Sequence, residues 1–391
     1  MWNRDRRVVM FLSDELWHCF NQLAAGLVRA GIDPVRVVTG RARRGRFTRF
    51  VEWAIYRGVI DLDAPGGLDD FRRLVASGRV VDVQVNEVLL AQLGLRSEIA
   101  DLVARASGVT VDRRAGWVDK VVLAGDVGAA RAAVPEWYPA DRVTAEQAAE
   151  RLGFPLVLKR RIGTGGRDVR IVRDHVALDR TMTEFGDNLT KLFFQAFVDG
   201  QLVGYGAVMS GPNVIAEFTA QEQKGHTNPL GPSTMVRTTD DAGFAALGRR
   251  IVGALGCEGL ASLEFLADAD GVLWLIDLSP RAWGCFCAFG GAGLDFVDAY
   301  VVGLGRPAAV ADTRRPEPGR ELRVTPAAVL DEVRVLGFGA LVATLVRDLR
   351  PYVRRLGLRY CAVVTVGVLI ERWPTAQPGE PDERPLMTRK S

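Results

Sequence analysis

This sequence of 391 residues lacks the short patterns that mark several common enzyme classes. No G-x-G-x-x-G follows its first predicted strand and no G-K-S/T opens a helix, which disfavours a dinucleotide site there and a Walker-type phosphate loop. Its five cysteines have no metal-type spacing, and the close pair Cys285 and Cys287 has no matching second pair. We therefore expect the cysteines to be small buried side chains in a reducing compartment.

The chain also has a small net charge and lacks a long apolar run. The formal net charge of +3 is too small an excess to predict a nucleic-acid partner. No apolar run reaches roughly 18 residues, which argues against a membrane-spanning helix, and the first residues lack the apolar region of a signal peptide. The expectation is a cytoplasmic enzyme of about two or three domains.

The predicted elements change character along the chain. A strand at 7–13, a helix at 16–30 and a strand at 34–39 predict a small parallel α/β domain. Further strands are expected at 79–85, 155–159, 168–173, 193–198, 203–209 and 214–218, and helices at 88–106, 144–152 and 242–256. Residues 306–320 read as a linker, and the proline- and charge-rich residues 373–391 as a disordered tail.

The most informative segment lies on either side of Asp270-Gly271. An Asp-Gly pair between apolar runs is the strongest short-range signal for a two-residue hairpin turn. Such a turn places Glu264 directly opposite Asp277. Opposed carboxylates repel each other unless a cation neutralises them, and Mg²⁺ is usually held by one or two carboxylates plus substrate phosphates. The hairpin therefore predicts a site for a metal-bound nucleotide.

A glycine-rich loop joins two of the predicted strands upstream. Lys159 ends the first strand, and Gly163-Thr164-Gly165-Gly166 follows it. Glycines let backbone N–H groups turn toward an anion, and Lys159 adds a point charge. Such a loop alone is typical of a simple turn, but with the carboxylate pair downstream it indicates a phosphate contact. Lys120, by itself, reads as an ordinary surface residue.

Two other polar segments have ordinary explanations beside functional ones. The arginine-rich residues 41–49 read as a solvated loop or helix start, with a contact to an anionic substrate or partner as the alternative. His226, in the polar loop that follows Lys224, is more often incidental than a base. Residues 333–370 are expected to pack on the core as helix and strand, and the alternative is a basic element lying on an anionic membrane surface.

Five motifs in fixed order resemble the ATP-grasp superfamily. They are Asp119-Lys120; residues 153–159 with the loop 163–166; residues 195–200; Glu264-Phe265; and residues 277–281. The segment from Pro280 to Phe296 is more similar to the carboxylate–amine ligases than to the carboxylases. The resemblance implies an α/β (α+β) chain with the ATP-grasp fold, in four parts. These are a Rossmann-like domain over 1–115, an ATP-grasp domain over 116–305 with a glycine-loop subdomain at about 140–200, a C-terminal extension over 306–372, and the tail.

The resemblance also implies roles for individual residues. The residues expected to bind ATP are Lys120, Lys159, Gly163, Thr164, Gly165, Gly166, Gln195, Ala196, Val198 and Gln201. The residues expected to hold one or two Mg²⁺ ions, with Mn²⁺ as an alternative, are Glu264, Asp277 and Ser279. Ser279 stands where relatives commonly carry asparagine, and a hydroxyl is the weaker ligand. Arg281 is expected to stabilise charge on the transferred phosphoryl group, and Lys224 to meet a substrate carboxylate.

The implied reaction is phosphorylation of a substrate carboxylate by ATP, followed by attack of an amine on the acyl-phosphate to give an amide, ADP and phosphate. One alternative is another ATP-grasp reaction, that of a carboxylase or a carboxylate kinase. A second is a nucleotide-binding regulatory protein without turnover. The expected partners are a small carboxylate and a small amine and no nucleic acid, in a monomer or a homodimer.

Overall fold

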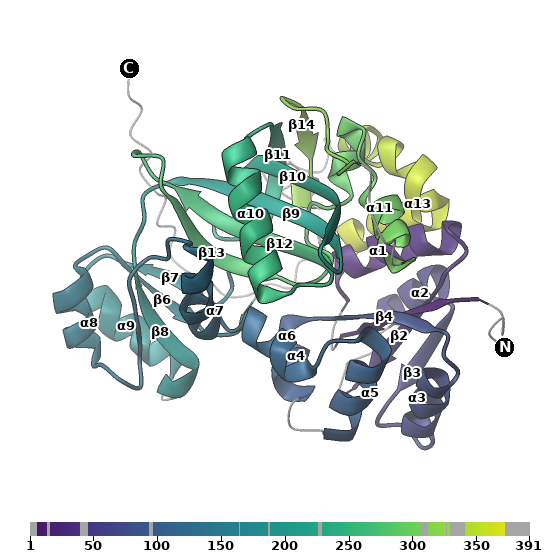
Figure 1. The fold of residues 1–391 in the computed structure, drawn as a ribbon, viewed down its shortest axis with the longest axis horizontal. Coiled ribbons are helices and arrows are strands. Elements are labelled where there is room, and N and C mark those ends of the chain that lie inside the picture. The colour runs from purple at the N-terminus through teal and green to yellow at the C-terminus, as the bar shows by residue number, and fades with distance from the viewer. Residues whose placement is uncertain are drawn as a thin grey trace.

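A computed structural model gives the fold of the chain. It describes residues 6–13, 16–39, 46–93, 97–163, 165–186, 188–225, 229–305, 312–325, 327–328 and 341–371. Thr164, His226, residues 306–311 of the predicted linker and the whole predicted tail lie outside the described residues, as do residues 41–45 of the arginine-rich segment. Figure 1 shows three lobes, each built around a separate β-sheet.

The N-terminal lobe is a parallel sheet in the order β3-β2-β1-β4, as the alternating elements predict. Its strands are β1 (Val8–Leu12), β2 (Asp33–Val38), β3 (Gly58–Asp61) and β4 (Val80–Val85). Its helices are α1 (His18–Arg29), α2 (Arg46–Ile55), α3 (Gly67–Ala76), α4 (Glu87–Leu93), α5 (Ser97–Ser107) and α6 (Val111–Val118). β1 and β2 are buried along their whole length because helices cover both faces of the sheet. Their carboxyl ends share one edge, where ligands of such sheets usually bind.

The second lobe is a small antiparallel sheet in the order β5-β8-β6-β7. Its strands are β5 (Trp137–Pro139), β6 (Leu156–Arg160), β7 (Val169–Val172) and β8 (Leu192–Ala196), covered by α8 (Ala145–Leu152) and α9 (His175–Phe185). Thr144 accepts from the N–H of Gln147, whose side chain accepts from the N–H of Thr144. This capping box starts α8 where the sequence predicts it.

The third lobe is a six-stranded antiparallel sheet in the order β13-β12-β9-β10-β11-β14. Its strands are β9 (Gln201–Ser210), β10 (Asn213–Lys224), β11 (Ser233–Thr239), β12 (Gly259–Ala267), β13 (Leu273–Ser279) and β14 (Glu321–Arg323). β11 was not predicted from the sequence, and the strand predicted at 214–218 ends six residues before β10 does. Alternate residues of β9 face opposite sides: Tyr205 packs with α10 (Ala242–Leu255), and Val208 lies in the core that includes α11 (Phe296–Leu304).

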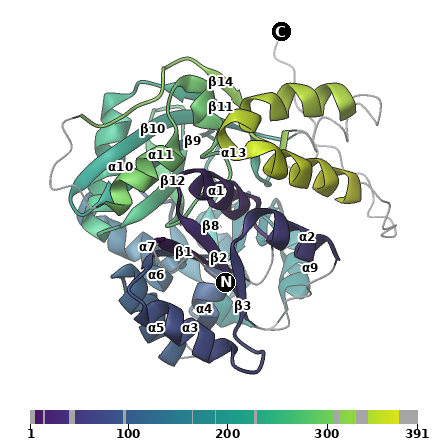
Figure 2. The same ribbon diagram turned by 90° about the vertical axis from the view of Figure 1, so that its right-hand side faces the viewer.

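The C-terminal part packs against both the third lobe and the N-terminal lobe. β14 extends the third sheet along β11, just beyond the predicted linker. α13 (Leu341–Glu371) bends at Gly357 and packs against α1 and α2, as Figure 2 shows. The described part of this segment, residues 341–371, is helical, so the strand expected within it is not found there. Among the described residues, no helix has both the length and the apolar character needed to cross a bilayer.

Candidate active site

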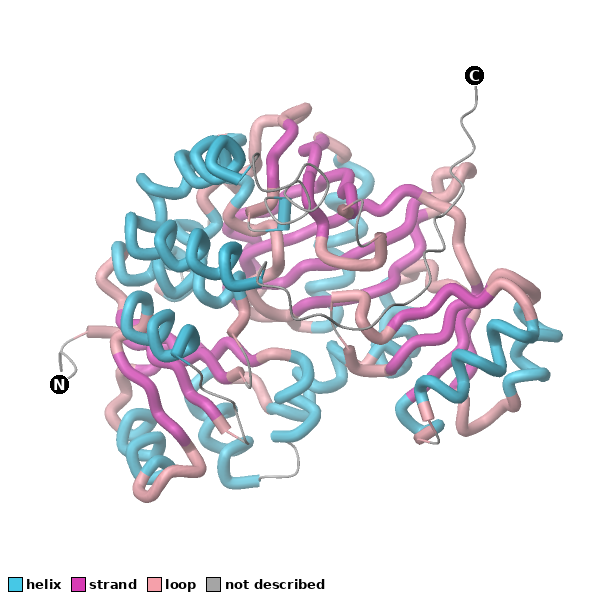
Figure 3. Tube along the Cα trace, turned by 180° about the vertical axis from the view of Figure 1, so that it is seen from behind, coloured by secondary structure: helices cyan, strands magenta, loops and turns pink. Residues whose placement is uncertain are grey.

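A cavity of about 560 Å³ lies where the three lobes meet, a volume typical of small-molecule sites. In the view from behind, the two antiparallel sheets lie next to each other (Figure 3). Residues of both sheets line the cavity, among them Lys159 and Glu264. The N-terminal lobe closes the third side with residues that follow β1 and β4, including Trp17 and Glu87. Side chains from sequence positions 16 to 285 therefore share one space.

The β12–β13 hairpin places Glu264 opposite Asp277, as predicted, but by a different route. Residues 268–272 form the connection, in which the Asp268 carboxylate accepts from the N–H groups of Asp270 and Val272 and from the Trp274 indole. The prediction of a two-residue turn at Asp270-Gly271 was therefore wrong. The longer loop shifts the register by one residue, and a β-bulge at Ile276 shifts it back before Asp277.

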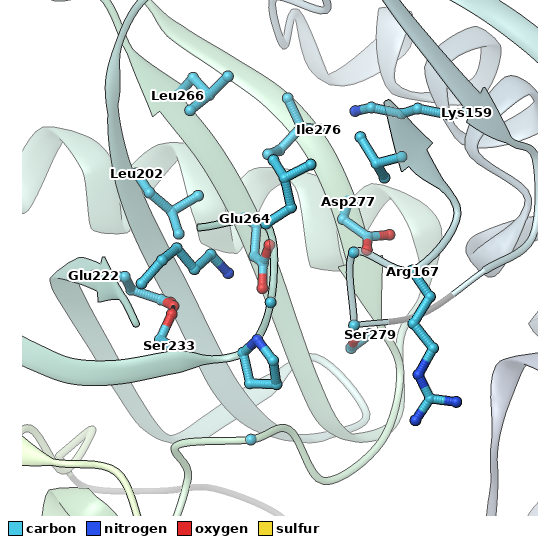
Figure 4. A pocket seen from close by; sticks show the side chains of 18 of the residues that line it. Lys159, Arg167, Leu202, Glu222, Ser233, Glu264, Leu266, Ile276, Asp277 and Ser279 are labelled. Carbon is cyan, nitrogen blue, oxygen red and sulfur yellow. Dashed lines mark hydrogen bonds between the residues drawn. The ribbon is translucent and has the colours of Figure 1, made fainter. Parts of the chain in front are cut away.

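The bulge also decides which side chains enter the cavity. Strict alternation would send Ile276 and Asp277 to opposite faces of the sheet, yet both line the cavity, together with Ser279. Ile276 joins Leu202 and Leu266 in an apolar end, while Glu264 and Asp277 form a polar end, which we call the hairpin wall (Figure 4). One segment thus supplies both an apolar surface and a carboxylate pair.

Lys120 is held against this wall and is not an exposed side chain. Its Nζ lies 3.2 Å from Oδ1 of Asp277 and donates to the carbonyl oxygen of Gly163 at 3.3 Å. Asp119 caps the helix α7 (Lys120–Asp126) and also binds the guanidinium of Arg161 at 2.8 Å. The Asp119-Lys120 motif therefore ties the glycine-rich loop to the hairpin.

Two lysines, the buried Lys159 and the half-buried Lys224, lie near the same carboxylates but have pKa values shifted in opposite directions. Burial, reinforced by the charge of Lys120, lowers the pKa of Lys159 to about 8. Burial would also lower the pKa of Lys224, but the negative charges of Glu264 and Glu222 outweigh it and raise that pKa. Lys224 is the last residue of β10, so the polar loop that follows it begins at Gly225.

Glu222 is a further carboxyl group that lines the cavity, and it was not predicted from the sequence. It accepts a short hydrogen bond from the Ser233 hydroxyl, visible in Figure 4. A Cβ at Gly204 would lie 2.3 Å from its Oε1, so this glycine makes room for the carboxyl group over β9. Burial, with the nearby charge of Glu264, raises the pKa of Glu222 to about 7.

The glycine-rich loop approaches the cavity from the second lobe. Gly165 and Gly166 line it with φ of +63° and +71°, a region that favours glycine. A Cβ at Gly166 would lie 1.7 Å from the carbonyl oxygen of Leu230, so the loop packs directly on the segment before β11. Gly163 does not line the cavity, although its carbonyl anchors Lys120.

The structure separates the four residues of the segment 195–201 that are expected to bind ATP. Gln195, Ala196 and Val198 line the cavity next to β6. Gln201 does not: its amide donates to the carbonyl oxygen of Glu222 at 3.0 Å. Its nucleotide-binding role therefore has no support from its position.

Arg281, expected at the transferred phosphoryl group, lines the same cavity and is tied to the N-terminal lobe. It is 5% exposed, forms an ion pair with Glu87 of the N-terminal lobe, and lies 4.4 Å from the ring centroid of Trp17. Ser279 Oγ, proposed as a metal ligand, is 3.5 Å from the same carboxyl group of Glu87. Trp17 and Glu87 were missed, although each follows a strand of the parallel sheet at its ligand-binding edge.

The residues present fit a magnesium-bound nucleotide. Among the described residues, no group of three or more His, Cys, Asp and Glu side chains forms a self-sufficient metal site. Two carboxylates therefore need further oxygen ligands, which is how Mg²⁺ binds together with substrate phosphates. Lys120, Lys159 and Lys224 supply positive charge around the pair. All five cysteines are free and buried, as predicted.

Known proteins similar to this chain also point to a nucleotide site. No family model matches the chain. The D-alanine–D-alanine ligase of Synechococcus sp. (strain JA-3-3Ab) is 26% identical over 178 residues, which cover 41% of this chain and 54% of that ligase. The match therefore spans about half the length of this curated relative.

Two solved structures cover more of the chain. N5-carboxyaminoimidazole synthetase from Staphylococcus aureus, complexed with ADP, has a TM-score of 0.60 at 12% identity and covers 86% of this chain and 98% of its own. The biotin carboxylase domain of Hydrogenobacter thermophilus 2-oxoglutarate carboxylase, with MgADP, ADP and bicarbonate, has a TM-score of 0.58 at 15% identity and covers 79% and 71%. These likenesses show a shared fold. Together with the motif order, they establish that this chain has the ATP-grasp fold.

Proposed function

We propose that the chain is an ATP- and Mg²⁺-dependent ligase, which phosphorylates a substrate carboxylate and joins the acyl-phosphate to an amine, releasing ADP and phosphate. The observation that carries this proposal is the Glu264–Asp277 pair, which shares one cavity with Lys120, Lys159 and Lys224. The sequence match to a D-alanine–D-alanine ligase supports this type of reaction.

The chain's own groups would act mainly by position and charge. Glu264 and Asp277 would hold the metal, with Ser279 or a water completing the ligands, and the metal would neutralise charge on the phosphates. Lys120 would exchange its contact with Asp277 for a phosphate oxygen. Lys159 and the Gly165–Gly166 backbone would bind phosphates from the opposite sheet, and Lys224 would meet the reacting carboxylate.

A carboxylase is the second candidate, because a carboxylase domain shares the fold over most of its length. Whether Mn²⁺ replaces Mg²⁺, and the cytoplasmic location, stay predictions. So do the domain boundaries at 115, 305 and 372.

The test is an ADP-release screen of the full chain with pairs of carboxylates and amines, run beside bicarbonate as the acid. A ligase releases ADP and phosphate only when both an acid and an amine are present, and mass spectrometry finds the amide. ADP release with bicarbonate, or with an acid alone, would instead identify a carboxylase or a carboxylate kinase. ATP binding without ADP release across the whole screen would identify a regulatory protein.

A further inference from the structure

The outer side of the helices α2 and α13 exposes large apolar side chains next to positive charge. The two helices pack against each other on the N-terminal lobe (Figure 2). Trp53 of α2 is 69% exposed and Leu358 of α13 is 74% exposed. The guanidinium of Arg359, the residue after Leu358, lies 5.4 Å from the ring centroid of Trp53, so the two helices meet here. Exposed apolar side chains that lie together mark a candidate contact site.

Arginines surround these apolar side chains. Arg46 and Arg49 are exposed and precede Trp53 by seven and four positions, a spacing that places all three on one side of α2. Arg359 adds a third exposed arginine directly beside the Trp53 ring. We call Arg46, Arg49, Trp53, Leu358 and Arg359 the outer helical face.

The acidic residues of the two helices do not offset this charge at the surface. Glu52 and Asp348 are each 4% exposed. Glu52 forms an ion pair of 2.8 Å with Arg36, and Asp348 forms one of 2.9 Å with Arg323. Among the described side chains of α2 and α13, every exposed charge is therefore positive.

This combination limits the kind of partner that fits the face. A second copy of the chain, docked by the same face, would bring arginines against arginines, which is unfavourable. The surface of an anionic bilayer satisfies both kinds of side chain. Its phosphates bind the arginines, while tryptophan and leucine enter the boundary between headgroups and acyl chains. The inner sides of the helices are held by the core through residues such as Val51 and Tyr360, so the face is formed before it binds.

We propose that the outer helical face binds the surface of an anionic phospholipid bilayer. The contact is peripheral: Trp53 and Leu358 enter the boundary region, and the three arginines bind lipid phosphates. None of the five residues of the face lines the active-site cavity, so the contact does not depend on the proposed ligase reaction. It would hold the enzyme at a lipid surface.

The first experiment measures co-sedimentation of the full chain with lipid vesicles. The probes are vesicles of phosphatidylcholine alone and vesicles of equal parts phosphatidylcholine and phosphatidylglycerol. We expect at least about tenfold tighter binding to the anionic vesicles, and weaker binding as salt screens the exposed arginines. Equal binding to both kinds of vesicle, or binding to neither, would overturn the proposal. Displacement from the vesicles by polyglutamate or by single-stranded RNA at equal charge concentration would also overturn it, because the partner would then be an acidic protein or a nucleic acid.

The second experiment separates the charged part of the contact from the apolar part. Arg49→Gln removes one charge near the lipid phosphates and should weaken binding to the anionic vesicles about fivefold at low salt. Trp53→Gln removes the largest apolar side chain of the face and should weaken binding about tenfold or more, at low and at high salt.

Helix α9 provides matched controls in the second lobe. Val176 is 79% exposed, and Arg180 is exposed four positions later on the same helix. Val176→Gln and Arg180→Gln should leave vesicle binding unchanged. All four substituted side chains are exposed, so thermal unfolding should stay the same in every variant. Equal losses of binding in the α9 variants and in the variants of the outer helical face would refute the assignment of the contact to this face.

A fluorescence measurement tests which side chain enters the lipid. The chain contains eight tryptophans, and Trp53 is the only exposed one among the described residues. Vesicles with brominated acyl chains quench a tryptophan that reaches the boundary region. We expect quenching that disappears in Trp53→Phe, a variant that keeps an aromatic ring and should still bind. Quenching that persists unchanged in Trp53→Phe would show that another part of the chain contacts the lipid, and the proposal would be wrong.

Discussion

The hairpin wall and the Glu87–Arg281 ion pair lie in one cavity but are built in different ways. Glu264 and Asp277 are thirteen positions apart and meet because one hairpin brings them together. Glu87 and Arg281 are separated by 194 positions and meet only because the N-terminal lobe packs against the third sheet. The first is a carboxylate pair that needs a cation, and the second is an ion pair already in balance. Pairing within one hairpin leaves two negative charges that a cation must neutralise. Packing of one lobe against another forms an ion pair whose two charges already cancel.

The largest expected effect comes from Asp277→Asn, which removes one charge of the hairpin wall without changing its shape. Metal-based charge stabilisation is worth several kcal/mol, so kcat/KM for ATP should fall about 100-fold or more. Asp268→Asn is the control on the same hairpin, because Asp268 holds the loop outside the cavity. An unchanged rate in Asp277→Asn would refute the metal assignment.

The next effect is a pH dependence confined to the nucleotide side. The pKa of Lys159 is lowered to about 8, so its amine is charged below that pH and loses its charge as the pH rises through it. Affinity for MgATP should therefore fall by up to about tenfold per pH unit above 8. Calorimetric titrations between pH 7 and 9.5 would measure it, and Lys159→Met should abolish the dependence. A dependence that survives in Lys159→Met would assign it to another group.

The smallest effect tests the link between the lobes. Gln84, 2% exposed, accepts from the N–H of Ala282 at 3.0 Å and donates to Asp82 at 2.8 Å, so it fixes the backbone beside Arg281. Gln84→Leu leaves a buried N–H unsatisfied and should lower the free energy of unfolding by about 1–3 kcal/mol. The KM for the amine should rise several-fold, and the KM for ATP should stay the same. If the KM for ATP rises more, the two regions are coupled through this bond.

The sequence was most informative where chemistry lies on one local element. The helix α8, the parallel N-terminal sheet and the Glu264–Asp277 pair were all predicted from short patterns. Even there the turn was wrong, because the hydrogen bonds of Asp268 and the bulge at Ile276 depend on how the strand pairs and packs. β11 was missed because its polar, alternating residues read as a loop until β10 and β14 pair with it on either side.

The sequence by itself determined the ATP-grasp resemblance and the carboxylate pair, because hydrophobic alternation and turn chemistry act over a few residues. Only the tertiary structure decided that Lys120 forms an ion pair with Asp277, that Gln201 lies outside the cavity, and that Arg281 binds Glu87. These contacts follow from the docking of lobes distant in sequence, where burial fixes charge, partner and pKa together. No local pattern records such docking.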